Sequence, residues 1–76
     1  MLVKLNEVKV GDNCVVKSVE GDGRIRRRLF DMGVTPGASI YIRKVAPLGD
    51  PVEITIRGYE LSLRKDEAKL VNVEVR

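Results

Sequence analysis

The residues best suited to bind another molecule are arginines gathered in one short segment. Four of the five residues from 24 to 28 are arginine, and Arg26, Arg27 and Arg28 are consecutive. The planar guanidinium group binds carboxylates and phosphates through two hydrogen bonds at once. This segment therefore predicts docking on an acidic protein surface or, as an alternative, on nucleic acid. A solvated helix face with no further role is the third interpretation.

The rest of the chain contains few groups that could catalyse a reaction or bind a metal. It has no histidine, the commonest general base, and its single cysteine, Cys14, lies in an apolar segment with no base nearby in the sequence. Zinc and iron(II) sites usually draw on clusters of histidine and cysteine. We therefore expect no enzymatic activity, no cofactor and no specific metal site, and we interpret Cys14 as a buried structural thiol.

Two further features lie near the arginines or in a turn. Phe30 is the only phenylalanine in the chain, and it either closes part of the core or forms an exposed apolar spot beside the arginines. The segment A-P-L-G-D-P, residues 46–51, is stiffened by two prolines and has Leu48 at its tip. It is either a plain connection or a partner-binding loop. The candidate partner-binding residues are Arg26, Arg27, Arg28, Phe30, Pro47, Leu48 and Asp50.

Alternating apolar and polar residues predict strands that would hold these segments in place. Period two is clear in four segments, which begin near Ser39, Val52, Glu60 and Val71. A fifth strand is expected over residues 13–19, with a bulge that reconciles Val15, Val16 and Val19. Shorter turns are expected near residues 6–8 and 66–69. The sequence therefore predicts a mainly β domain, with five strands curled into a small barrel.

One segment has helical rather than strand periodicity. Ile25, Leu29 and Met32 recur at the spacing of one helix face. Asp22 can cap the start of this helix, and Gly33 stands where a left-handed residue would end it. We expect a helix of two to three turns inserted between strands. Structural turn or cap roles are expected for Gly11, Gly33, Gly37 and Gly58.

The length and composition are those of one small folded domain. The chain has 76 residues, of which 43% are hydrophobic, and its net charge is +3. We expect a single domain over residues 1–76, although a chain this short buries only about 60% of its unfolded surface. Neither a signal peptide nor an apolar run of about 20 residues is present. We therefore expect a cytosolic protein.

Several motifs occur together in an order that resembles the FeoA family from end to end. They are R-R-R-L-F-D-M-G at residues 26–33, P-G at 36–37, A-P-L-G-D-P at 46–51, L-S-L-R-K-D-E-A at 61–68 and a closing V-x-V. The Src-homology-3-like (SH3-like) domain of iron-dependent repressors shares parts of this pattern. No helix-turn-helix precedes these motifs, so we expect the free-standing form.

The resemblance implies a five-stranded SH3-like barrel with one short helix. It also implies an accessory or regulatory protein of ferrous iron uptake that binds FeoB, a membrane transporter with a cytosolic GTP-hydrolysing domain. Such a protein could assist GTP turnover through an arginine finger, stabilise the transporter complex or sense metal. Two alternatives remain, a small nucleic-acid-binding barrel and a peptide-binding autoregulatory module with a pocket lined by Tyr41 or Tyr59.

Overall fold

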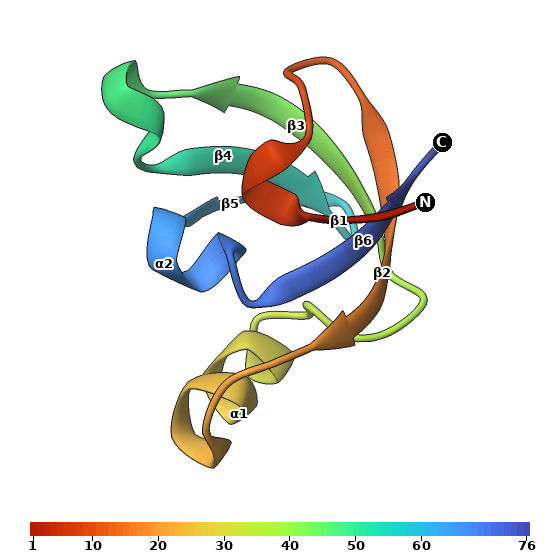
Figure 1. Ribbon diagram of the computed structural model, residues 1–76, viewed down its shortest axis with the longest axis vertical. Coiled ribbons are helices and arrows are strands. Elements are labelled where there is room, and N and C mark those ends of the chain that lie inside the picture. The colour runs from red at the N-terminus through yellow and green to blue at the C-terminus, as the bar shows by residue number, and fades with distance from the viewer.

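The computed structural model describes all 76 residues, and its strands form one antiparallel sheet (Figure 1). The order of the strands in the sheet is β1-β6-β2-β3-β4-β5. Two helices, α1 and α2, and two short 3-10 turns, η1 and η2, connect them. The bounds are β1 Leu2–Lys4, η1 Leu5–Glu7, β2 Asn13–Val19, α1 Gly23–Asp31, β3 Ser39–Val45, η2 Pro47–Gly49, β4 Val52–Ile56, β5 Tyr59–Leu63, α2 Lys65–Ala68 and β6 Val71–Val75.

The alternating pattern places one face of each long strand in a common core. Ile42 of β3 pairs with Ile54 of β4, and both side chains are fully buried. Cys14 and Val73 lie in the same cluster of 17 buried residues. The four strands predicted from period two and the fifth expected over residues 13–19 are therefore confirmed, because each one presents apolar residues to this cluster.

The structure has six strands, one more than the sequence predicts. The additional strand is β1, which pairs with β6 so that Val3 lies opposite Val73. Three residues are too few to show an alternating pattern, which is why this strand was not predicted. The sheet curls but does not close into a continuous barrel, since β1 and β5 each have a strand neighbour on one side only.

The predicted irregularity in β2 is present. The pairing register with β6 shifts between Val16 and Ser18. Because of this shift, Val16 and Val19 both face the core, whereas Val15 is half-buried on the other side. The bulge therefore explains the mixed pattern of this segment.

Helix α1 starts and ends as its sequence predicts. The side chain of Asp22 accepts a hydrogen bond of 3.0 Å from the backbone N–H of Ile25. At the other end, Gly33 has a φ of 93°, and its N–H donates to the carbonyl of Phe30 at 2.9 Å. The N–H of Val34 donates to the carbonyl of Leu29 at 3.0 Å, and both of these side chains are buried. These are the bonds of a Schellman cap, which needs a residue with positive φ at position 33.

The two short turns expected near residues 6–8 and 66–69 appear as η1 and α2, shifted by one residue. Both contain a fully buried residue, Leu5 in η1 and Ala68 in α2. No helix in the structure is long and apolar enough to cross a membrane.

Candidate functional site

Three segments outside the sheet follow one another along one edge of the molecule, from the upper left to the bottom of Figure 1. They are α1, α2 and the loop of residues 46–51, and together we name them the helical edge. The carboxylate of Asp50 accepts a hydrogen bond of 3.0 Å from the backbone N–H of Lys65 at the start of α2. Arg28 of α1 forms an ion pair of 3.2 Å with Glu67 of α2. Helix α2 therefore lies between the two segments that the sequence indicated and contacts both of them.

The three consecutive arginines are all exposed, but two of them bind groups within the molecule. The Nε of Arg26 donates a hydrogen bond of 3.0 Å to the carbonyl of Val19, and its guanidinium lies 4.8 Å from the centre of the Phe30 ring. Arg28 pairs with the buried Glu67. Of the three, only Arg27 has no ion pair or side-chain hydrogen bond within the molecule. Arg24, which the sequence analysis did not select, is equally free.

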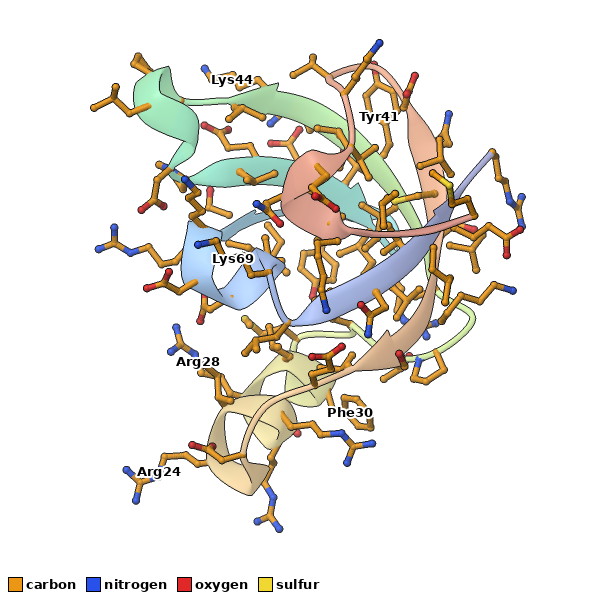
Figure 2. The ribbon with its side chains drawn as sticks, viewed as in Figure 1. Arg24, Arg28, Phe30, Tyr41, Lys44 and Lys69 are labelled. Carbon is orange, nitrogen blue, oxygen red and sulfur yellow. The ribbon has the colours of Figure 1, made fainter.

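Phe30 contributes to packing rather than to an apolar spot among exposed arginines. Its side chain is half-buried and packs against the core. Figure 2 shows Phe30 and Arg28 on opposite sides of α1. Its location matches the first of the two interpretations of Phe30.

The loop of residues 46–51 exposes a large apolar side chain. Leu48 is 97% exposed, and its φ of 70° lies in the left-handed region that a leucine seldom adopts. Pro47 begins the turn η2, and Asp50 is held by the bond to α2. Within this loop, Leu48 is thus the side chain without a structural role inside the molecule. Features of this kind, which are locally unfavourable in a folded chain, are often found at functional sites.

The tight turn between β4 and β5 holds the end of α1, a contact that the sequence analysis missed. Arg57 and Gly58 both have positive φ, as a two-residue hairpin turn requires. The Nε of Arg57 donates to the carbonyl of Gly33 at 3.0 Å, and the hydroxyl of Tyr59 donates to the carbonyl of Met32. A cation at the carbonyl end of a helix also interacts favourably with the negative end of the helix dipole. We name this contact the hairpin clamp. Gly58 indicated the turn in the sequence but not the segment that the turn contacts.

The predicted turn glycines all adopt left-handed backbone. The φ values are 92° for Gly11, 93° for Gly33, 92° for Gly37 and 84° for Gly58. Only at Gly33 would an added Cβ meet other atoms, because the side chain of Arg57 lies 3.2 Å from that position.

The remaining reactive group, the thiol of Cys14, is enclosed. Burial, with a smaller contribution from the charge of Asp12, raises its pKa from 9.0 to about 11, so the thiolate is scarce at neutral pH. No three His, Cys, Asp or Glu side chains lie close enough together to hold a metal ion. A shallow hollow of about 260 Å³ lies on the sheet; it is lined by neither Tyr41 nor Tyr59 but by Val15, Lys17, Glu74, Val75 and Arg76.

Known proteins have this fold, and several of them are also similar in sequence. The structure matches that of a zinc-complexed FeoA from Stenotrophomonas maltophilia, described as an SH3 domain protein, with a TM-score of 0.82 and 29% identity over 95% of this chain and 89% of that one. The FeoA-like protein from Clostridium acetobutylicum gives a TM-score of 0.90 and 44% identity over 97% of this chain and 86% of that chain. IdeR of T. acidophilum, 21% identical, shares the fold, with a TM-score of 0.88 over 99% of this chain and 34% of that chain.

The fold is thus SH3-like, with six strands rather than the five expected. The model of the FeoA domain family matches residues 3–75, and the chain belongs to this family. A curated relative from Porphyromonas gingivalis, an Fe(2+) transport protein A/Fe(2+) transporter FeoB fusion protein, is 40% identical over 73 residues. That match spans 96% of this chain and 9% of the fusion protein. The family is therefore associated with ferrous iron transport.

Proposed function

We propose that this protein is a cytosolic, non-enzymatic accessory protein of ferrous iron uptake that binds the cytosolic part of the transporter FeoB. The observation that carries the proposal is the fusion protein of Porphyromonas gingivalis, in which a domain 40% identical to this chain is covalently joined to FeoB. A covalent link keeps two domains at a high effective concentration. Fusion is thus favourable when the two domains act together, and it supports binding between the separate proteins.

The helical edge is the surface that we assign to this contact. Leu48 at one end and Arg27 at the other have no partner inside the molecule, whereas Arg26, Arg28 and Asp50 bind groups of the chain itself. Protein interfaces often combine an exposed apolar anchor with arginine. With Cα extents of 29 × 24 × 24 Å, the molecule is small enough for one partner to cover both ends of the edge.

The scarcity of groups that could act as a base or a nucleophile supports a non-enzymatic role. The chain has no histidine, and its single thiol is buried and protonated at neutral pH. If an arginine of residues 24–28 assisted GTP hydrolysis by FeoB, it would be Arg24 or Arg27, since Arg26 and Arg28 are engaged within the domain.

Binding to FeoB can be measured directly with the full-length transporter of the same organism in lipid nanodiscs. We expect the parent chain to bind and Leu48→Asp to bind at least about tenfold more weakly, because a charge at the tip would have to be desolvated in the interface. Val10→Asp is the matched control, since Val10 is also exposed, at 55%, but lies in the turn before β2 rather than on the helical edge. Circular dichroism would verify that both variants are folded.

Two results would contradict the proposal. If the parent chain bound FeoB neither with GTP nor without it, the proposed function would be wrong. If Leu48→Asp and Val10→Asp bound as tightly as the parent, the helical edge would not be the interface, and the outer face of the sheet around Tyr41 and Thr55 would be examined next.

A further inference from the structure

Much of the acidic charge of the chain is neutralised within the molecule. Lys4 forms an ion pair of 2.8 Å with Glu20, and hydrogen bonds from Lys4 and Asn72 lower the pKa of that carboxyl group. Further ion pairs join Lys17 to Glu74, Arg28 to Glu67, and Arg43 to both Glu53 and Glu60. The net charge of +3 is therefore carried mainly by bases outside these pairs.

Four exposed bases on the two helices have no ion pair and no side-chain hydrogen bond. They are Arg24 and Arg27 on α1, and Arg64 and Lys69 at the two ends of α2. Figure 2 shows Arg24, Arg28 and Lys69 on the side of the molecule where α1 and α2 lie. Arg24 is the second residue of α1 and lies in its first turn, where a positive charge interacts unfavourably with the helix dipole. Arg24 therefore does not stabilise its own helix.

We propose that these four bases, which we name the basic edge, bind an acidic segment of the partner protein, with α2 near the centre of the contact. The inference rests on the proposed function and names the chemistry of the partner surface. Arg24, Arg27 and Arg64 can each bind a carboxylate through two hydrogen bonds. An acidic segment would also interact favourably with the N-terminal end of α1, whereas Arg24 in that first turn does not.

The composition of the surface favours a protein over a lipid headgroup layer or a nucleic acid. Asp31 and Asp66 are exposed among the four bases and form no ion pair. A uniformly anionic surface would repel both carboxylates, whereas a protein can place a base opposite each of them. Single-stranded nucleic acid also needs aromatic stacking, but Phe30 is half-buried and Tyr59 bonds to the end of α1.

The test uses variants with equal loss of charge at different places. Arg24→Gln/Arg27→Gln removes two charges from the basic edge, and Lys9→Gln/Arg76→Gln removes two elsewhere, in the turn before β2 and at the C-terminus, on the side of the sheet away from α1 in Figure 1. Affinity for FeoB in nanodiscs of uncharged lipid would be measured from about 0.1 M to about 1 M salt, a range over which the screening length falls from about 10 Å to about 3 Å. Empty nanodiscs of anionic lipid would be measured in parallel.

We expect the first variant to bind FeoB about tenfold more weakly than the parent and with a flatter salt dependence, because steering by charge is lost. The control variant should stay within about twofold. The inference is overturned if the two variants weaken binding equally, or if empty anionic nanodiscs bind the parent as tightly as FeoB does, which would make lipid the ligand.

A second measurement decides the inference even if the parent chain does not bind FeoB, a result that would refute the proposed function. Amide chemical shifts would be followed by NMR during titration with a short oligoglutamate peptide and with an RNA oligonucleotide of equal charge. We expect the peptide to shift the signals of α1 and α2 first. Shifts centred on Lys9 and Arg76, or stronger binding of the RNA, would contradict the inference.

Discussion

Arg27 and Arg28 are adjacent in the sequence but differ in what they contact. Arg27 has no partner within the molecule, whereas Arg28 forms an ion pair with Glu67, whose side chain is only 7% exposed. Glu67 also accepts a hydrogen bond of 2.9 Å from the backbone N–H of Arg64, which helps to start α2. A carboxylate in such a position is costly when its cationic partner is removed.

We therefore expect Arg28→Ala to lower the free energy of unfolding by about 1–3 kcal/mol. Arg27→Ala, the matched control, should change it by less than about 0.5 kcal/mol, as exposed charges generally do. Urea titration followed by circular dichroism measures both values. Equal costs for the two substitutions would show that the ion pair contributes nothing to folding.

Cys14 gives a prediction about alkaline pH. Its pKa is raised from 9.0 to about 11 in the folded chain, so the folded state holds the proton more tightly than the unfolded state does. The resulting stabilisation is fully present below about pH 9 and is lost as the pH rises toward about 11. The difference in urea midpoint between the parent and Cys14→Ala should therefore narrow across this window, while other titrating groups affect both proteins alike. A constant difference would show that the thiol is not desolvated.

At the scale of elements, the orientation of α1 depends on both of its ends. Asp22 fixes the start, and the hairpin clamp of Arg57 and Tyr59 binds the carbonyl groups at the other end. The helix contributes one fully buried side chain, Leu29, and two half-buried ones, Ile25 and Phe30. Because α1 is short and buries so little surface, the contacts at its two ends are needed to hold it in place.

The hairpin clamp can be tested by comparing two glycines. Gly33 and Gly37 have φ values of 93° and 92°, but an added Cβ would lie 3.2 Å from the Arg57 side chain only at Gly33. Gly37→Ala should cost about 1 kcal/mol from left-handed backbone alone, and Gly33→Ala should cost more, about 1.5–3 kcal/mol. Thermal and urea denaturation measure both. Equal losses of stability for the two substitutions would mean that the Arg57 side chain moves away from the added methyl group at no cost.

At the scale of the whole molecule, a single core of 17 residues stabilises all the elements. For a chain of 76 residues, the total stability is on the order of 4–11 kcal/mol. The free energy lost by creating one cavity in this core is therefore a large fraction of the total stability. The free energy lost by substitutions on the surface of the helical edge is a small one.

Ile54 is fully buried between β3 and β5, opposite Ile42 and Leu61. Ile54→Ala should lower the free energy of unfolding by about 2–5 kcal/mol, enough to leave much of the protein unfolded at growth temperature. Thr55→Ala, a neighbouring change on the outer face of β4, is the control and should cost less than about 1 kcal/mol. An unchanged melting temperature for Ile54→Ala would refute the strand register.

The sequence by itself determined the elements whose signals are local. Period two marked four strands, and a mixed apolar pattern marked a fifth over residues 13–19. The i, i+4, i+7 spacing from Ile25 to Met32, with Asp22 before it and Gly33 after it, marked α1. The motif order also predicted the FeoA family, which the family model confirms over residues 3–75. The strand and helix signals could be read from the sequence because each depends on residues within a few positions of one another.

Contacts between distant residues could be decided only by the tertiary structure. Arg28 is engaged because it pairs with Glu67, and Arg26 is engaged because it binds the carbonyl of Val19. The periodicity of the sequence does not predict either partner. The pairing of β1 with β6 and the clamp from Arg57 to Gly33 likewise join segments far apart in the chain. The sequence thus indicated that arginines and Leu48 could form a binding surface. Pairing in three dimensions engaged Arg26 and Arg28 within the fold and left Arg24, Arg27 and Leu48 without a partner in the molecule.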